Sequence, residues 1–534
     1  MALIAMSLNA QLLHTTVAQG EVEGVEQNGL AHYKGIPFAT PPVGDLRWKA
    51  PLPAQKWQGV YKADSFKDKP YQQSQGPARP GQPGVSEDCL YLNVLTPAKK
   101  AGEGLPVLVW IHGGGFNTGA SWENNGEKFA KAGIVYAAIT YRTNVFGFLS
   151  LPELSQESQK ENGRAISGNY GLMDQIMALQ WIHDNIAAFG GDPEKVTIMG
   201  ESAGAISVAM LCQSPLTKGL FRGAISESGG NMAPEDNVRI DNNSIRNMVG
   251  SEKYGKDFIN RIGMGKLKLK DLRKVDPEKF MGDPIAFGAG GALWPVYDGY
   301  VLKGDPYPMY QQGDYNDVNI LMGTNSDEGS MFTGFLGGYK PEQYEQEIKE
   351  SFPDANWQQK FREMYPGKTD QEAFDAHSDI FREAAFAWPT YAWGNLQSKN
   401  TADGKGKGKV YMFFFNHAKQ NFFRNGQKTD RQYVTMHAGE LGLSFGQLGG
   451  FGGPASPSDE ALSSLVMQYW INFIKTGDPN GGYLPLWPIY AEGTECVINF
   501  RDGAFLTGIH NLPQLQLWEE YMKWRRAHKT TIKK

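Results

Sequence analysis

Short β-branched apolar runs alternate with helix-length segments through most of this chain, and this alternation constrains the fold more than any other feature. Such alternation favours an α/β fold with a largely parallel sheet. Runs without polar residues, such as V-L-V-W-I at 107–111, fit strands that are covered on both faces. The predicted strands lie at 92–95, 106–111, 134–140, 196–199, 224–227, 318–323 and 410–414, and the clearest predicted helices at 171–188, 203–213 and 458–476.

The composition excludes several classes of protein. The 534 residues are 41% hydrophobic and 20% charged, which is the balance of a large globular protein and not of a disordered one. A net charge of −5 disfavours a protein whose main work is to bind nucleic acid. No apolar run reaches 18 residues, so we expect no membrane-spanning helix. The three cysteines, Cys89, Cys212 and Cys496, are far apart and form no Cys/His cluster of the kind that binds zinc.

We expect one large domain over residues 20–534. Residues 1–19 are either the remnant of a secretory leader, since A-L-I-A-M followed by S-L-N-A resembles the end of one, or a frayed terminus. The first alternative favours a secreted or periplasmic protein, and the second leaves a cytoplasmic one open. Residues 69–87, rich in Gln, Gly and Pro, are typical of a long surface loop. Residues 240–400 depart from the alternation, and we expect part of this region to form a helical cap inserted over the sheet.

The sharpest local signal is V-T-I-M-G-E-S-A-G-A at 196–205. An apolar strand runs into a G-x-S-x-G sequence and then into a helix of small residues, which is the context that gives this sequence its meaning. The turn is so tight that side chains at 200 and 204 would collide with backbone. Ser202 then lies exposed at the start of a helix, whose N-terminus favours developing negative charge. The segment predicts a nucleophilic serine at Ser202.

A second apolar strand, at 106–111, ends in His112 and three glycines. Because glycine has no Cβ, backbone N–H groups in such a loop can turn toward one point. The intermediate of acyl transfer needs donors of this kind where its oxygen becomes charged. Upstream of the serine turn, the loop predicts an oxyanion hole formed by the N–H groups of Gly114, Gly115 and Ala203.

A serine nucleophile needs a general base and a carboxylate that orients the base. In α/β enzymes that carry this serine turn between a strand and a helix, the acid and then the histidine follow the serine along the chain. His437 lies in a loop-like V-T-M-H-A-G-E-L segment, and His417, which follows the strand at 410–414, is the alternative by position. The strand at 318–323 leads to Asp327 and Glu328, and spacing does not distinguish these two acids. The histidines that follow Ser202 are His377, His417, His437, His510 and His528.

These segments stand among longer motifs whose order resembles that of the type B carboxylesterase family, which includes bacterial para-nitrobenzyl esterases, animal carboxylesterases and cholinesterases. The resemblance covers nearly the whole chain. It implies an α/β-hydrolase fold, with a mostly parallel central sheet flanked by helices, and a serine esterase without metal or cofactor. The motifs are Y-K-G-I-P-F-A (33–39), S-E-D-C-L-Y-L-N-V (86–94), H-G-G-G-F (112–116), G-N-Y-G-L-M-D-Q (168–175), A-F-G-G-D-P-E-K-V-T-I-M-G-E-S-A-G-A (188–205), S-P-L-T-K-G-L-F (214–221) and T-G-D-P-N (476–480).

The resemblance also implies roles for individual residues. In the D-E-G motif the family's acid is the glutamate, which favours Glu328 over Asp327. In the H-x-x-E-L motif the family's base is the histidine, which favours His437 over His417. The family's supporting polar residues, which would position the base through hydrogen bonds and buried water, match Glu201, Ser228 and Glu440.

Two departures from the family's pattern affect the predicted location and substrate of the protein. In many animal members the cysteine of E-D-C-L pairs with a cysteine about two dozen residues upstream, whereas Cys89 has no cysteine before it. The loop at 69–87 is therefore without a disulfide, which weakens the argument for an extracellular protein. Cholinesterases carry a choline-binding tryptophan in the same loop, but residues 66–88 contain none, so we do not expect a choline-specific enzyme.

Aromatic residues line the acyl and alcohol pockets of the family. The candidates here are Phe116, Trp294, Phe386 and Trp388, and each could instead pack inside the cap. The resemblance therefore predicts hydrolysis of small to medium acyl or aryl esters through an acyl-enzyme, by a monomer or homodimer whose partner is a small-molecule ester. Two alternatives stay open: an amide or carbamate hydrolase with the same residues, and a binding or adhesion protein on the same fold. The intact set of serine, acid, histidine and glycine donors argues against the second.

Overall fold

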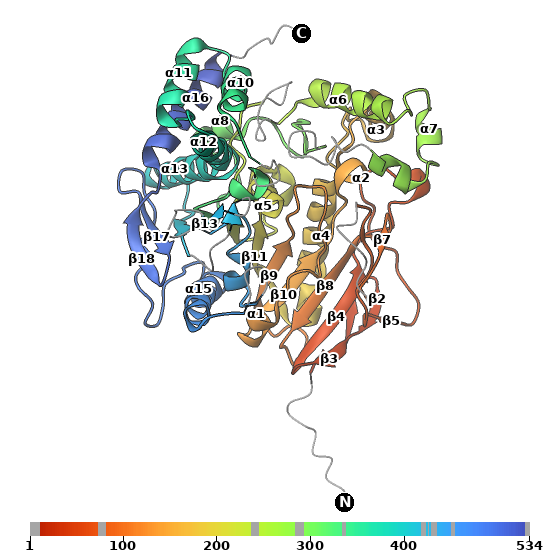
Figure 1. Cartoon of the computed structure of the whole chain (residues 1–534). Helices are drawn as coiled ribbons and strands as arrows, with labels where there is room; N and C mark the ends of the chain where they lie inside the picture. The colour runs from red at the N-terminus through yellow and green to blue at the C-terminus, as the bar shows by residue number, and fades with distance from the viewer. Residues whose placement is uncertain are drawn as a thin grey trace, which may run out of the picture.

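The computed structural model describes residues 11–72, 82–235, 245–282, 293–333, 338–417, 435–449 and 454–528, and the backbone of 423–424 and 427–428. Its centre is one large twisted sheet (Figure 1). The strands of this sheet are β3 (Val25–Gln27), β4 (Leu30–Pro37), β8 (Tyr91–Thr96), β9 (Leu105–Ile111), β10 (Val135–Ile139), β11 (Gly191–Glu201), β12 (Gly223–Glu227), β13 (Asn319–Asn325), β14 (Val410–Phe415), β17 (Cys496–Phe500) and β18 (Ala504–Gly508).

The order of these strands is β18-β17-β14-β13-β12-β11-β9-β10-β8-β4-β3. Every neighbouring pair from β17 to β10 is parallel, and the pairs at both edges are antiparallel. All the predicted strands are present, as β8 to β14. The prediction of an α/β fold with a largely parallel sheet is confirmed.

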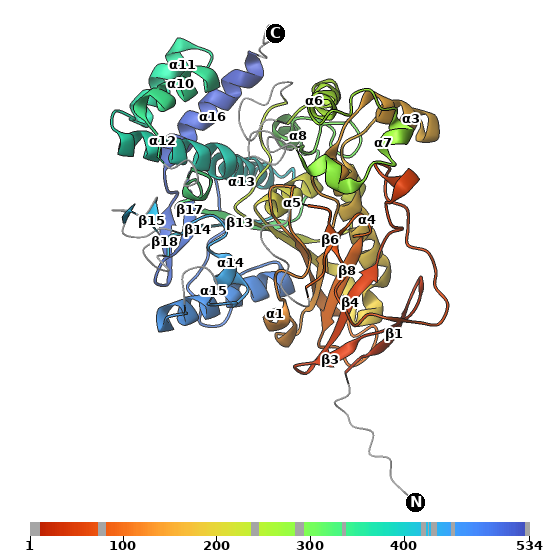
Figure 2. The same ribbon diagram turned by 45° about the vertical axis from the view of Figure 1, so that its right-hand side comes forward.

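Helices cover both faces of the sheet, as the strand sequences require (Figure 2). In β9, Val107 and Val109 belong to one hydrophobic core, whereas Leu108 and Trp110 belong to the other. The first core packs against α4 (Tyr170–Asn185), α5 (Ala203–Gln213) and α13 (Trp388–Ala402). The second packs against α1 (Glu127–Lys131) and α15 (Pro457–Thr476).

The region predicted as a cap, 240–400, is mostly helical where the structure describes it, but β13 interrupts it. A π-helical turn, Glu383–Ala387, joins α12 to α13. In both views α10 to α12 gather with α16, while α6 and α7 lie at the other side of the molecule (Figures 1 and 2). The helices are α6 (Met248–Arg261), α7 (Leu269–Leu272), α8 (Pro306–Gln312), α9 (Ser330–Thr333), α10 (Pro341–Ser351), α11 (Ala355–Met364), α12 (Asp370–Arg382) and, beyond the region, α14 (Leu441–Ser444) and α16 (Leu512–Ala527).

The N-terminal part differs from the prediction of a leader remnant or frayed terminus at 1–19. Residues 1–10 lie outside the described residues, but β1 (His14–Val17) pairs with β2 (Gly20–Glu23), which in turn pairs with β5 (Val60–Lys62). The folded part therefore begins before residue 20. Two short helices follow β10 in the same half of the chain, α2 (Asn144–Phe148) and α3 (Pro152–Asn162), and two strand fragments, β6 (Lys69–Pro70) and β7 (Val85–Ser86), form one small ladder.

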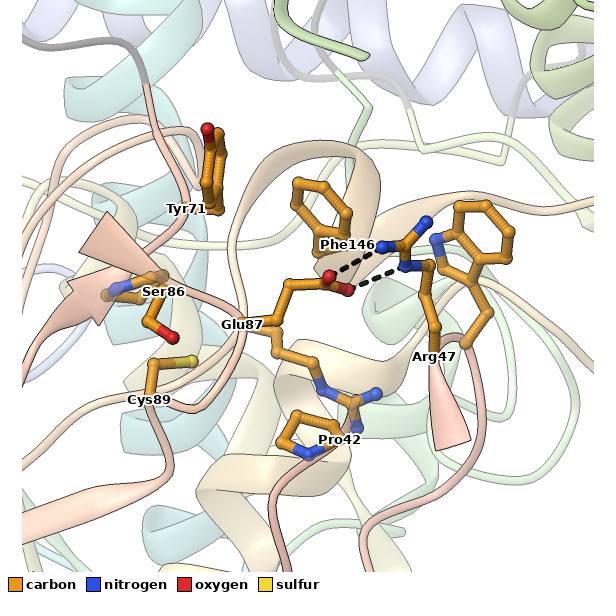
Figure 3. Close-up of a pocket in the computed structure, with 10 residues that line it drawn as sticks. Pro42, Arg47, Tyr71, Ser86, Glu87, Cys89 and Phe146 are labelled. Atoms are coloured by element: carbon orange, nitrogen blue, oxygen red, sulfur yellow. Dashed lines mark hydrogen bonds and ion pairs between the residues drawn. The ribbon is translucent and has the colours of Figure 1, made fainter. Parts of the chain in front are cut away.

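An ion pair holds the end of the loop predicted at 69–87, of which residues 73–81 lie outside the described part. Arg47 donates from Nε and Nη2 to the two carboxylate oxygens of Glu87, at 2.6 and 2.5 Å (Figure 3). The guanidinium also lies 5.6 Å from the ring centre of Phe146. Cys89 is buried nearby, and all three cysteines are unpaired. A partly buried, bidentate ion pair therefore fixes this loop end where no disulfide does.

Candidate active site

Ser202 lies at the tight turn between β11 and α5. Its backbone has φ 57° and ψ −125°, a conformation that residues with a side chain rarely adopt. A Cβ on Gly200 would lie 2.3 Å from the carbonyl carbon of Gly204, and a Cβ on Gly204 would lie 2.1 Å from the carbonyl oxygen of Ile111. The turn therefore needs glycine at both positions, and this packing holds the serine at the carboxyl end of the sheet.

The imidazole of His437 lies between Ser202 and Glu328. The Ser202 Oγ is 2.8 Å from Nε2, and Nδ1 is 2.7 Å from Oε2 of Glu328. Both His437 and Glu328 are buried. The other oxygen of Glu328 accepts hydrogen bonds from the Ser228 hydroxyl and the Asn325 N–H, each at 2.6 Å. Three donors thus surround this carboxylate and fix its position, so that it orients the imidazole.

The two alternatives from the sequence, His417 and Asp327, have other partners. The Nε2 of His417 is 2.7 Å from Asp459 at the start of α15, and its Nδ1 is 2.6 Å from the carbonyl oxygen of Arg501. The backbone N–H of Asp327 donates to the carbonyl oxygen of Thr435. The structure therefore brings His437 and Glu328, rather than His417 and Asp327, to Ser202.

The glycine loop after β9 lies directly against the serine turn. Gly114 and Gly115 have φ values of 99° and 62°, a region that favours glycine. A Cβ on Gly113 would lie 3.2 Å from that of Ser202, so the loop and the serine are in close contact. Ala203 is the first residue of α5, and its N–H has no carbonyl one turn earlier in the helix. The glycine loop and the first residue of α5 therefore both adjoin Ser202.

Two more buried glutamates belong to the site, one beside the imidazole and one beside Asn325. Oε1 of Glu201 lies 3.3 Å from Nε2 of His437, and the side chain of Asn325 donates to Glu440. Burial, together with the charges of Glu328 and Glu227, raises the pKa of Glu201 well above its usual range. Burial and the neighbouring glutamates raise the pKa of Glu440 in the same way. Near neutral pH the protonated form is favoured for both, so the site avoids a cluster of uncompensated negative charges.

Comparison with known proteins identifies the family. The model of the Carboxylesterase family matches residues 11–518. The chain therefore belongs to the carboxylesterase family. It is 32% identical to the fumonisin B1 esterase of Sphingopyxis macrogoltabida over 89% of this chain and 84% of that protein. It is also 32% identical to the para-nitrobenzyl esterase of Bacillus subtilis, over 90% and 93%.

A solved structure of PNB esterase agrees with this assignment. It matches the carboxylesterase with a TM-score of 0.76 and 29% sequence identity, and the match covers 94% of this chain and 99% of that chain. The carboxylesterase therefore has the α/β-hydrolase fold and is a carboxylic ester hydrolase, as the order of its sequence motifs predicted. None of the helices that the structure describes is long and apolar enough to cross a membrane.

Aromatic rings border the imidazole of this carboxylesterase. Phe386, on the π-helical turn, stacks on His437 with 4.5 Å between ring centres, and Phe332 of α9 lies at 5.1 Å. Phe116 directly follows the glycine loop, and its ring is 4.9 Å from that of Trp294. Trp388 begins α13, and its indole N–H donates to Glu519 of α16 at 2.8 Å. Its contacts favour packing of these helices over a role in the pocket.

A polar cavity of about 250 Å³ adjoins the glycine loop and Glu201. The indole nitrogen of Trp110 and Nε2 of His112 are buried beside it, and neither has a hydrogen-bond partner among the described residues. Burial lowers the pKa of His112 to about 4, so its ring is neutral at physiological pH. Other lining residues are Lys69, Gln72, Thr118 and Glu123.

Sequence reasoning missed three residues of the site: Glu227, Asn325 and Phe332. Two of them had a signal. Glu227 ends a predicted strand whose neighbour carries the serine, and Asn325 stands three residues before the predicted acid. Phe332 had none, because only the three-dimensional path of α9 brings its ring to His437.

Proposed function

We propose that this carboxylesterase cleaves esters by nucleophilic attack of Ser202, with His437 as general base and Glu328 as the acid that orients it. The chain of hydrogen bonds from Ser202 through His437 to Glu328, 2.8 and 2.7 Å long, is the observation that carries this proposal. Distances of this length are those over which a proton passes between nucleophile and base.

The reaction then takes two acyl transfers. Ser202 Oγ forms a bond with the ester carbonyl carbon while its proton passes to His437 Nε2, and the carbonyl oxygen becomes negative. The N–H groups of Gly114, Gly115 and Ala203 donate to that oxygen. The bond to the alcohol breaks, the alcohol takes the proton from His437, and an acyl-serine forms. Water activated by His437 cleaves the acyl-serine by the same steps in the same order.

Three residues position this machinery in the proposal: Glu201, Ser228 and Glu440. Ser228 donates to Glu328 and fixes its carboxylate. A neutral Glu201 lies beside Nε2 of His437 without forming an ion pair that would compete with Ser202. Glu440 holds Asn325, whose backbone donates to Glu328. Each contact reduces the freedom of the base and its acid before substrate arrives.

The walls of the site support small to medium acyl or aryl esters as substrates. Rings of Phe332 and Phe386 give an apolar side next to His437, where apolar groups of an ester bind favourably. Phe116 and Trp294, which contact each other after the glycine loop, add apolar surface to the same proposal. The polar cavity beside Glu201 suits a hydroxylated part of the substrate, because Trp110 and His112 each present an unused hydrogen-bonding atom there. The related enzymes named after para-nitrobenzyl and fumonisin B1 esters agree with an ester of this general class.

The same proposal includes the organisation of the chain. Residues 20–534, together with β1, would form one hydrolase domain whose helices between 240 and 400 cover the catalytic residues. A small-molecule ester is the only partner that this reaction needs, so the chain would act as a monomer or a homodimer. Light scattering on the purified enzyme measures which of these two it is.

The first test is hydrolysis of para-nitrophenyl esters from acetyl to dodecanoyl, with wild type and Ser202→Ala compared. We expect activity that is highest with short or medium chains and a kcat that falls by roughly 10⁴-fold or more in the variant, since nucleophile and base act as a unit. Ser207→Ala, which removes another buried hydroxyl from α5, is the matched control and should keep its activity within about threefold.

Three further measurements distinguish His437 from His417, a catalytic from a non-catalytic protein, and an esterase from an amide hydrolase. His437→Gln should lose as much activity as Ser202→Ala, whereas His417→Gln should retain it. An aryl phosphonate that reacts with activated serines should label the wild type but not Ser202→Ala. If Ser202→Ala keeps more than a tenth of the wild-type kcat, the assignment of the nucleophile is wrong. If esters are inert while matched anilides are cleaved, the bond class is wrong and the nucleophile stands.

A further inference from the structure

Glu227 is a buried carboxyl group at the esterase site for which the catalytic steps give no role. It ends β12 directly opposite Glu201 in the parallel register, and its side chain is fully buried. Its backbone carbonyl accepts a hydrogen bond of 3.0 Å from the N–H of Ser202. The main chain of Glu227 is therefore attached directly to the nucleophile.

The side chain of Glu227 reaches the segment that follows the base. Its Oε1 accepts from the indole N–H of Trp470 on α15 at 2.7 Å, and its Oε2 lies 3.3 Å from the hydroxyl of Ser444 on α14. Ser444 in turn donates from its backbone N–H to the carbonyl oxygen of Glu440 at 2.9 Å. Since Glu440 follows His437 by one turn of chain, Glu227 joins the strand of the nucleophile to the segment of the base.

We propose that Glu227 is a positioning residue of this carboxylesterase. Its main chain binds Ser202, its carboxyl group binds the segment of His437 through Ser444, and Trp470 of α15 fixes that carboxyl group, so that together these contacts set the distance between Ser202 and His437. This inference rests on the proposed function of those two residues. A displacement of about 1 Å between reacting groups costs roughly 100-fold in rate, so a tie of this kind affects kcat more than KM.

The ionisation of Glu227 also affects the pKa values of the neighbouring carboxyl groups of Glu201 and Glu440. Burial raises the pKa of Glu227 to about 8, against the lowering effect of the hydrogen bonds from Trp470 and Ser444. Below that pH the carboxyl is neutral; above it, a negative charge appears beside Glu201 on β11 and Glu440 before α14. That charge raises the pKa of Glu201 and of Glu440. Ionised Glu227 therefore helps Glu201 to keep its proton as pH rises.

A protonated Glu201 matters because of where it lies. Its Oε1 is 3.3 Å from the nitrogen of His437 that must pass a proton between Ser202 and the leaving alcohol. An ionised Glu201 would bind the imidazolium proton at that nitrogen and slow its transfer. Removal of the charge of Glu227 should therefore let Glu201 ionise at lower pH, and the fall of kcat at alkaline pH should begin earlier.

The test compares kcat, KM and pH profiles of four variants on para-nitrophenyl butyrate. Glu227→Ala and Trp470→Phe should each lower kcat by about 10- to 100-fold with KM within about threefold of wild type. Glu227→Gln, whose amide can still accept from Trp470 and bind Ser444, should keep at least a third of kcat at pH 7. Its alkaline limb should move down by about one pH unit, which a purely structural role would not produce.

Trp487→Phe is the matched control. Trp487 is a neighbouring buried tryptophan, 6.1 Å from the ring of Trp470, but its indole N–H donates to the carbonyl oxygen of Met412. Its kcat should stay within about threefold of wild type. If Glu227→Ala does not fold by circular dichroism, Trp470→Phe replaces it. A folded Glu227→Ala or Trp470→Phe with unchanged kcat overturns the inference, and so does an unshifted alkaline limb in Glu227→Gln. In either case a dead Ser202→Ala would leave the proposed function intact.

Discussion

The two sides of the proposed catalytic site are held by different forces. On the nucleophile side, the turns after β9 and β11 meet backbone to backbone, and Gly113 and Gly204 leave no room for a Cβ. On the base side, His437 is held by side chains: a carboxylate, a neighbouring hydrogen-bond network and a stacked ring. A side chain that clashes with the backbone disrupts the whole turn, whereas hydrogen bonds and ring stacking can be removed one at a time.

The difference also concerns where the parts come from. The nucleophile side uses two short motifs, each of which determines its own local geometry. The base side brings Glu328 together with His437 and Glu440, which lie more than 100 residues further along the chain. Residues of β12, α14 and the π-helical turn hold these side chains in place. We therefore expect substitutions to have abrupt effects on the first side and graded effects on the second.

The largest effect is expected from Gly204→Ala. The added Cβ would lie 2.1 Å from the carbonyl oxygen of Ile111, and the helix that presents Ser202 and the Ala203 N–H must shift to relieve the clash. We expect kcat to fall by about 10³-fold or more, since the proposed nucleophile and the proposed oxyanion donor move together. Steady-state kinetics on para-nitrophenyl acetate measures this.

Gly508→Ala on β18 is the control for that substitution, because a Cβ there meets nothing within 4 Å. It should leave kcat unchanged. A folded Gly204→Ala enzyme with kcat within tenfold of wild type would show that the turn can adapt, and the contrast between the two sides would disappear.

The sequence predicts the nucleophile side well because the geometry of this side is local. The same local backbone packing is why we expect substitutions there to have abrupt effects. The strand at 196–199, the helix at 203–213 and the need for small residues at 200 and 204 all appear in the structure. Each is a local property of a few consecutive residues. The seven strands predicted between 92 and 414 were recognisable for a similar reason, since uninterrupted apolar runs mark strands covered on both faces.

An intermediate effect is expected from Asn325→Leu. The side-chain amide of Asn325 donates to Glu440 and to the carbonyl oxygen of Met436, next to His437. Leucine has a similar size but leaves both acceptors buried without that donor, at a cost of about 1–3 kcal/mol each. We expect kcat to fall by about 10- to 100-fold through displacement of His437 and Glu440, with a smaller change in KM.

Asn400→Leu provides the comparison for stability. Asn400 is also a buried asparagine, but it lies on α13 and donates to the carbonyl oxygen of Tyr310. The two variants should lose comparable thermal stability in differential scanning fluorimetry, and only Asn325→Leu should lose kcat. Equal kinetic effects would mean that general loosening, and not the position of the base, explains the result.

The base side was harder to predict because its contacts are tertiary. From residues alone, His417 and His437 could not be separated, nor could Asp327 and Glu328; only the resemblance to a family favoured one of each pair. The structure shows why position was uninformative: His417 also follows a strand and also has a carboxylate partner, but that partner is Asp459 of α15. Trp388 illustrates the same limit, since an aromatic residue in the cap region can bind another helix as well as line a pocket.

The smallest effect is expected from Phe386→Leu, which tests the stacked ring on the base side. Phe386 lies on the π-helical turn, a feature that often marks functional sites, and its ring stacks on His437 at 4.5 Å. The preceding Arg382 donates to the carbonyl oxygen of Ser326, which ties this turn to the segment of Glu328. Leucine keeps the apolar volume but removes the stacking, which is worth about 0.5–1.5 kcal/mol, so kcat/KM should fall by roughly 2- to 12-fold.

Phe361→Leu is the control for this substitution. Phe361 is a buried phenylalanine stacked on Phe352 in the helical region, and its replacement should leave kcat/KM unchanged. A loss above 100-fold in Phe386→Leu would mean that this single ring holds the base as firmly as the backbone holds the nucleophile, and that the base side is not graded after all.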